Sequence, residues 1–109
     1  MIKYRITKGR NGNDSIKIES KEVSLKEMAK RISRRSGLPE ADVILLIEDL
    51  KVELASSMSK GERVSLGDFG TFALAANRNK AGVQPGIRYY PGKEIVETIE
   101  SANFIEIKD

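Results

Sequence analysis

Two stretches of sequence decide the fold: RVSLGDFGTFAL (residues 63–74) and IRYYPGKEI (residues 87–95). Apolar residues alternate with other residues in the first stretch, and this period of two predicts a β-strand; residues 87–90 of the second stretch are strand-like as well. Gly67 and Gly70 indicate a bulge or a close approach of the backbone inside the first strand. In the second stretch, Pro-Gly-Lys predicts a turn into a short helix that continues over Ile95, Val96 and Ile99.

The segment between these strands is predicted to lie outside the core. Residues 75–86 have almost no large apolar side chain, so they form either a projecting hairpin or a loose loop. Residues 73–93 carry four basic residues and no acidic residue. If a hairpin forms, each strand of this arm has about six residues and reaches about 20 Å at ~3.3 Å per residue.

Two helices are predicted before the first strand. Ser24 and Glu27 form a capping box, in which the Ser hydroxyl accepts from a backbone N–H and Glu27 reaches back to the cap. Gly37 ends this amphipathic helix. Pro39 opens the second helix, and residues 60–61 close it.

The second helix is apolar on two sides. One stripe contains Val43, Leu46, Ile47, Leu50, Leu54 and Met58, and an offset stripe contains Ile44, Leu45, Val52 and Ala55. A chain of this size can hardly cover both sides, so a partner subunit is the simpler explanation. The alternative is a central helix enclosed by the chain's own strands.

A further hairpin is predicted at the start of the chain. Residues 2–6 and 16–18 alternate apolar and polar residues, and residues 8–15 form the loop between them. A last short strand at Phe104, Ile105 and Ile107 is a candidate to pair with this hairpin. We interpret residues 1–22 as a structural addition rather than a binding site.

Composition excludes several kinds of chemistry. The chain has 109 residues with no cysteine and no histidine, so disulfides, Ser-His triads and the usual zinc sites lack their parts. We therefore expect no enzyme activity, no cofactor or metal, and no small-molecule substrate. The N-terminus does not resemble a signal peptide, and the apolar run at residues 43–47 is too short to span a bilayer. We expect a cytoplasmic protein that does not bind membranes.

Basic and acidic residues are segregated along the chain, although the net charge is only +3. Residues 24–37 carry five basic and one acidic residue, whereas residues 38–61 carry two basic and five acidic residues. Such segregation suits a protein that contacts phosphates on one side, but ordinary solvated surfaces would give it too.

The order helix–helix–strand–arm–strand–helix, with VSLGDFGTF (residues 64–72) and IRYYPGKEI (residues 87–95), resembles the HU/integration host factor family of bacterial DNA-binding proteins. The resemblance covers about residues 23–103. Residues 1–22 are an addition like that of variants in Bacteroides-type bacteria. The arm is shorter than usual, and Lys80 replaces the proline that inserts between base pairs in the family. Pro85 is a possible substitute.

The resemblance implies an α+β, HU-like (IHF-like) fold that forms an intertwined homodimer. Two N-terminal helices and a β-sheet would carry a projecting β-ribbon arm, followed by a short C-terminal helix. One domain over residues 1–109 is expected. It comprises an added hairpin (1–22), a helical dimerisation region (23–61), the sheet and arm (62–93), and a C-terminal helix and strand (94–109).

The function implied is that of a nucleoid-associated architectural protein. Its arms would bind double-stranded DNA in the minor groove with little or no sequence specificity. The candidate DNA-binding residues are Asn77, Arg78, Asn79, Lys80, Gln84, Pro85, Arg88 and Lys93. Two alternatives remain: Arg78 and Lys80 simply solubilise a loop tip, or the fold serves as a structural or protein-interaction module with weak or no DNA binding.

Overall fold

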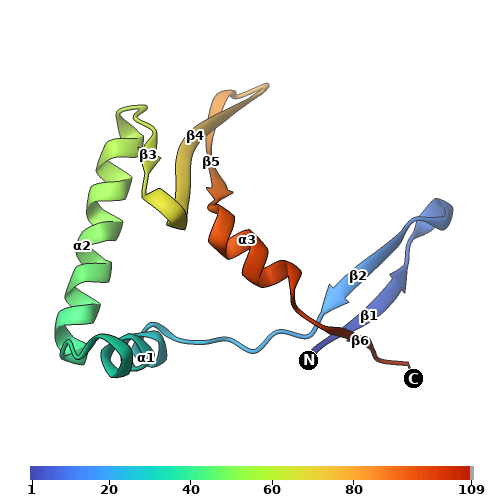
Figure 1. Cartoon of the computed structure of the whole chain (residues 1–109). Coiled ribbons are helices and arrows are strands. Elements are labelled where there is room, and N and C mark those ends of the chain that lie inside the picture. The colour runs from blue at the N-terminus through green and yellow to red at the C-terminus, as the bar shows by residue number, and fades with distance from the viewer. Residues whose placement is uncertain (109) are drawn as a thin grey trace. The chain divides into compact units, whose positions relative to one another are not determined.

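The computed structural model describes residues 1–108 and divides the chain into two compact units (Figure 1). The first unit comprises residues 1–22 together with the chain from Glu97 onward, and the second comprises Val23–Val96. The strands are β1 (Ile2–Lys8), β2 (Asp14–Ile18), β3 (Val64–Ser65), β4 (Gly70–Asn79), β5 (Gly82–Pro91) and β6 (Phe104–Glu106). The α-helices are α1 (Leu25–Ser36), α2 (Glu40–Ser59) and α3 (Lys93–Glu100), and short 3-10 turns occupy Arg10–Gly12 and Gly67–Phe69.

The first unit contains a three-stranded sheet in the order β2-β1-β6. β1 and β2 form the predicted antiparallel hairpin, and β6 pairs with β1 in parallel, with Ile2 opposite Phe104. The prediction that the last strand pairs with the hairpin is therefore confirmed. The loop predicted over residues 8–15 is shorter, because pairing continues to Lys8 and Asp14. It is closed by a hydrogen bond of 2.9 Å from Gly9 N–H to the Asn13 carbonyl oxygen.

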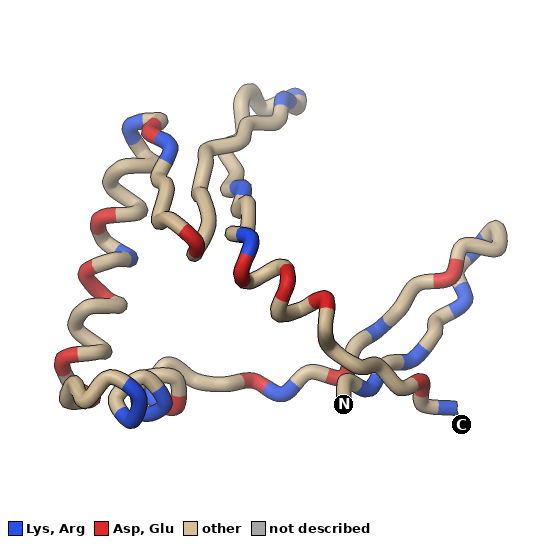
Figure 2. The backbone as a smooth tube through the Cα atoms, in the orientation of Figure 1, with Lys and Arg blue, Asp and Glu red and all other residues tan. Residues whose placement is uncertain are grey.

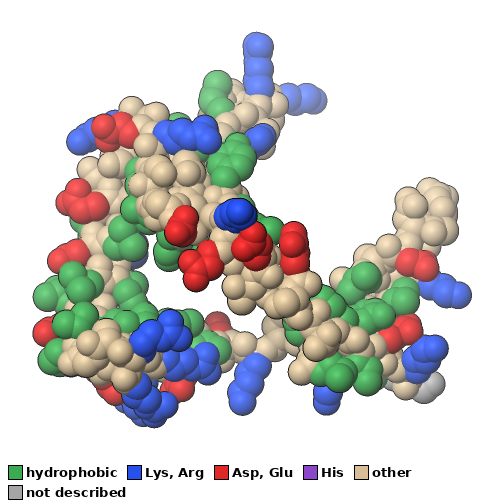
Figure 3. Space-filling model, viewed as in Figure 1, with side chains coloured by type: hydrophobic (Ala, Val, Ile, Leu, Met, Phe, Trp, Pro, Cys, Tyr) green, Lys and Arg blue, Asp and Glu red, His purple; other side chains and the backbone are tan. Residues whose placement is uncertain are grey.

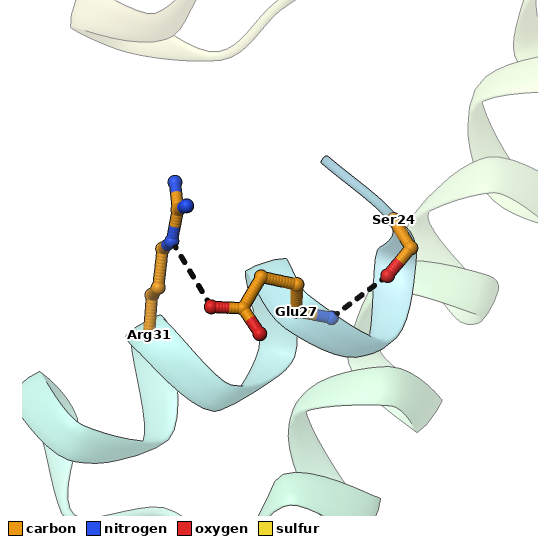
Figure 4. A network of polar contacts seen from close by, with 3 residues as sticks. All are labelled: Ser24, Glu27 and Arg31. Carbon is orange, nitrogen blue, oxygen red and sulfur yellow. Dashed lines mark hydrogen bonds and ion pairs between the residues drawn. The ribbon is translucent and has the colours of Figure 1, made fainter. Parts of the chain in front are cut away.

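Helix α1 begins at the predicted cap and ends at the predicted glycine. The Ser24 hydroxyl accepts a hydrogen bond from Glu27 N–H at 3.1 Å (Figure 4). Gly37 adopts a left-handed conformation with φ 79°, and its N–H donates to the Ser33 carbonyl oxygen. The predicted return contact from Glu27 to the cap is wrong. Its carboxylate lies 3.5 Å from Arg31 Nε, one turn further along the helix.

Helix α2 runs through the second unit, but the chain covers it only in part. Among the described residues, only Ala29, Val43 and Met58 are buried apolar side chains. Leu45, Leu46 and Val52 keep about three fifths of their surface exposed, at 60%, 59% and 58%. The alternative of a helix enclosed by its own strands is therefore wrong for the single chain.

The second sheet has the order β3-β4-β5. The single strand predicted over residues 63–74 is divided into β3 and β4. Residues 67–69 form a 3-10 turn that separates β3 from β4. Gly67 has φ 58° and Gly70 has φ 129°, and Leu66 N–H donates to the Gly70 carbonyl oxygen across the turn. The glycines mark a reversal of the chain, after which β4 folds back antiparallel on β3.

Strands β4 and β5 form a regular hairpin, so of the two expectations for residues 75–86 the projecting hairpin is correct. The register runs without interruption from Gly70 opposite Pro91 to Asn79 opposite Gly82. Each strand has ten residues and a length of about 33 Å at ~3.3 Å per residue. Beyond Leu74 and Ile87, which line the groove beside α2, the arm comprises residues 75–79 and 82–86, close to the six residues per strand expected.

Gly70 cannot be replaced without strain. A β-carbon at residue 70 would lie 2.5 Å from the Tyr90 carbonyl oxygen and 2.7 Å from the Tyr89 ring, in a backbone conformation that disfavours side chains. We predict that Gly70→Ala lowers the free energy of unfolding by about 1–3 kcal/mol. Gly86→Ala is the matched control, because a β-carbon there would be 4.0 Å from the nearest atom, a backbone oxygen. Urea unfolding measures both, and equal stability of the two variants would contradict the prediction.

Candidate functional site

The base of the β4–β5 hairpin is stiffened by an aromatic cluster. Phe72 and Tyr89 are cross-strand partners whose rings stack with centroids 4.9 Å apart. Phe69 lies against both rings at 6.0 and 6.3 Å, and the Tyr89 hydroxyl donates a 2.6 Å hydrogen bond to the Phe69 carbonyl oxygen. These contacts join the turn at residues 67–69 to both strands of the hairpin at its base.

The register gives the arm two faces of different chemistry. Asn77 lies opposite Gln84, and with Asn79 and Arg88 they occupy alternate positions on one face. The other face carries Arg78 opposite Val83, then Pro85 opposite Ala76. Seven of the eight predicted site residues thus lie on one hairpin. The amides share a face with one cation, and Arg78 and Pro85 lie on the other.

The tip is a tight turn at Lys80 and Ala81. Asn79 Oδ1 accepts a 2.8 Å hydrogen bond from Ala81 N–H, and Gly82 has φ 114°. Such a side-chain-to-backbone bond is typical of Asn in turns. Asn79 therefore shapes the tip, and Lys80 is presented at its end.

The arm is positively charged and unscreened by nearby acids. Within residues 1–108, Arg78, Lys80 and Arg88 form no ion pair, and no acidic residue lies between positions 73 and 93. Lys93 is separate from the hairpin and begins α3. Figure 2 shows the cations of the hairpin and, by contrast, the acids along α2 and α3.

The structure brings two further side chains to the arm that the sequence analysis did not select. Arg63 lies 5.3 Å above the ring of Tyr90, on the face that carries Arg88. Val83 is 70% exposed next to the tip. The cation–π contact joins Arg63, which directly precedes β3, to Tyr90 on β5, and no local sequence pattern predicts this contact.

Beside the arm base, an open apolar groove of about 600 Å³ separates α2 from the sheet. Its α2 side includes Ile47, Leu50 and Leu54, and its sheet side is formed by Phe69, Phe72, Leu74 and Ile87. Leu50, Leu74 and Ile87 remain 42%, 47% and 72% exposed. These side chains form an apolar surface that the described residues of the chain leave partly exposed.

The described residues contain neither a membrane-length apolar helix nor a group of three acidic side chains that could hold a metal ion.

A family model described as an HU domain fused to wHTH, Ig or glycine-rich motif matches residues 1–106. The DNA-binding protein HU of Thermotoga maritima is 25% identical over 87 residues, which cover 69% of this chain and 97% of that protein. Integration host factor subunit alpha of Bartonella quintana is 28% identical over 89 residues, covering 80% of this chain and 86% of that protein.

Two solved structures share the fold. One is a crystal structure of a putative bacterial DNA-binding protein from Bacteroides vulgatus, with a TM-score of 0.74 and 16% identity. The match covers 97% of this chain but only 48% of that one, so this chain spans about half its length. The other is an Anabaena HU–DNA cocrystal structure, with a TM-score of 0.60 and 14% identity, covering 73% of this chain and all of that one.

Proposed function

We propose that this chain, which belongs to the HU-HIG branch of the HU/integration host factor family, binds double-stranded DNA as an architectural homodimer. The observation that carries the proposal is the β4–β5 arm. It combines an acid-free surface, exposed cations and a row of amides on a hairpin with a rigid base. The DNA-binding part of the proposal is supported by the name of the Thermotoga maritima relative and by the fold shared with the Anabaena HU–DNA cocrystal structure.

The chemistry of the arm fits the DNA minor groove. Asn77 and Gln84 lie side by side on one face and can donate to the acceptors that every base pair presents there. Arg78 and Lys80 can contact the phosphates that border the groove. Because the minor groove distinguishes base pairs poorly, we expect little sequence preference. Binding would depend mainly on electrostatics.

The dimer is proposed from the apolar groove beside α2. A second copy would bring its own exposed α2 leucines to this surface, so that each chain covers what the other leaves open. Obligate homodimer interfaces are more apolar than transient ones, which agrees with the lining of the groove. In such an intertwined dimer, two β4–β5 arms would extend from one shared body and could bind the same duplex.

The role proposed is mechanical and involves no catalysis. It would place the protein on chromosomal DNA in the nucleoid of a bacterial cytoplasm, where it bends or condenses the duplex. With Lys80 at the tip, insertion between base pairs would be weak. Bending should therefore be smaller than in relatives with a proline there.

The dimer can be tested at Leu50. In a single chain, Asp at this half-exposed position would stay hydrated, whereas in the dimer its carboxylate would be buried without a partner, which costs several kcal/mol. We predict that light scattering at tens of micromolar shows a dimer for the wild type, and that Leu50→Asp dissociates or unfolds it. Glu53→Gln, an exposed polar change on the same helix, is the control. A monomeric wild type would refute the homodimer.

The arm can be tested through the salt dependence of DNA binding. Arg78→Ala together with Lys80→Ala removes up to four phosphate contacts from a dimer, so the log–log salt slope should flatten by up to about 3–4 units at roughly 0.9 per contact. Gel-shift titrations of random duplex DNA at several salt concentrations measure this slope. An unchanged slope and affinity would exclude the arm as the DNA-binding element and favour a protein-interaction module instead.

A further inference from the structure

The sheet of the first unit has two faces of different chemistry. The register gives one face the apolar cross-strand pairs Ile2–Phe104, Tyr4–Ile18 and Ile6–Ile16. The opposite face carries the cations Lys3, Arg5 and Lys17. Figure 3 shows hydrophobic side chains at the surface of this unit.

The apolar face is open to solvent. Ile6, Ile16 and Ile18 keep 45%, 65% and 48% of their surface exposed, and Phe104 keeps 53%. The rings of Tyr4 and Phe104 meet edge to face with centroids 6.3 Å apart. Together with Ile16 and Ile18 they line an open hollow of about 460 Å³, which agrees with the register in placing these side chains on one face.

The first unit has no second layer that covers this face. Besides the sheet, its described residues form only the turn Arg10–Gly12 and the C-terminal end of α3. Ile99 at that end of α3 is itself 61% exposed, and no described residue of the unit is buried. A small sheet is stable when its apolar face packs against another layer. The occupant of this face therefore comes from outside the first unit.

The charges around the apolar face fit a second copy of the same face. Lys8 lies opposite Asp14 at the turn end of the face, whereas Glu106 lies in the other half. If two copies stack about a two-fold axis with antiparallel strands, the Lys8 end of each copy lies over the Glu106 half of the other. An isologous interface requires this kind of self-complementarity. The opposite face would repel its own copy, because Glu19 offsets only one of its three cations.

We propose that the apolar face of the β2-β1-β6 sheet binds the same face of a second copy of this chain. The two sheets would pack as a two-layer sandwich, about 10 Å apart. Seven residues of β1 and three strands give a face about 23 Å long and about 14 Å wide.

The size of the face determines its place in the assembly. Its area is roughly 300 Å² per copy, whereas a stable interface buries about 800 Å² per partner. The contact is therefore too small to hold two chains together alone and adds to the α2 interface. In this respect it rests on the proposed homodimer.

Cross-linking tests the contact directly. The chain has no cysteine, so a single introduced thiol reports on its own surroundings. Ile16→Cys places the thiol on the apolar face, and Thr7→Cys, an exposed position on the opposite face, is the matched control. We expect a bis-maleimide with a spacer of about 10 Å to link Ile16→Cys into covalent dimers and to leave Thr7→Cys mostly unlinked. Equal linking of the two variants, or no linking of Ile16→Cys, would overturn the proposal.

Thermal unfolding shows whether the face is buried in the native protein. Ile16→Thr with Ile18→Thr removes apolar surface but keeps β-branched residues, and Ser15→Thr with Lys17→Thr is the control on the opposite face of the same strand. The sandwich predicts a lower unfolding midpoint for the first double variant only, because it loses apolar burial. Equal midpoints would contradict the sandwich. A lower midpoint without cross-linking of Ile16→Cys would mean that another surface covers the face, which also overturns the proposal.

Sedimentation of the wild type separates this contact from the proposed α2 interface. If Ile16→Cys is cross-linked and the wild type is a dimer, one pair of chains makes both contacts, whereas a tetramer means that the sheet face joins two dimers. Both results support the proposal. A wild-type dimer without cross-linking of Ile16→Cys refutes the sheet contact and leaves the homodimer intact. A monomeric wild type refutes both.

Discussion

The apolar contact between α2 and the face of the second sheet is the interaction on which the rest of the structure depends. Helix α2 contacts β3 and β4, and Phe69, Phe72 and Leu74 line one apolar groove together with Leu54 and Met58 of α2. The contact is incomplete, because the groove between the two surfaces stays open. Hydrophobic burial is the main favourable term in folding, and few side chains in one chain are fully buried. A second copy would supply the missing surface and place a second arm on the same body.

Much of the fold could be predicted because its signals are local. A cap at Ser24 and a left-handed glycine at residue 37 bound α1, and both are set by the residue and its immediate neighbours. Apolar alternation likewise predicted the N-terminal hairpin, and the strand-like residues 87–90 fall within β5. The polarity of residues 75–86 showed that this segment projects from the core, which placed most of the candidate site on one hairpin.

Features that depend on contacts distant in sequence could not be predicted. Gly67 and Gly70 predicted a local irregularity, but not that the chain reverses at residues 67–69, since the reversal follows from β4 pairing with both β3 and β5. The two faces of the arm depend on the register of β4 and β5, which the tight turn at Lys80 and Ala81 and the stacking of Phe72 on Tyr89 accompany. Glu27 had two partners within reach, the cap and Arg31, and the pairing in the structure is with Arg31. Arg63, just before β3, joins the site through Tyr90, which is distant in sequence on β5.

Folding of this chain is expected to be coupled to its association, since one chain leaves its own apolar surface uncovered. The most direct test is the thermal unfolding midpoint of the wild type, measured over two orders of magnitude in protein concentration. When folding and association are one reaction, mass action raises the midpoint as concentration increases. We predict such a rise with a single cooperative transition. A midpoint that is independent of concentration would mean that the single chain is stable alone, and would contradict the coupling of folding to association.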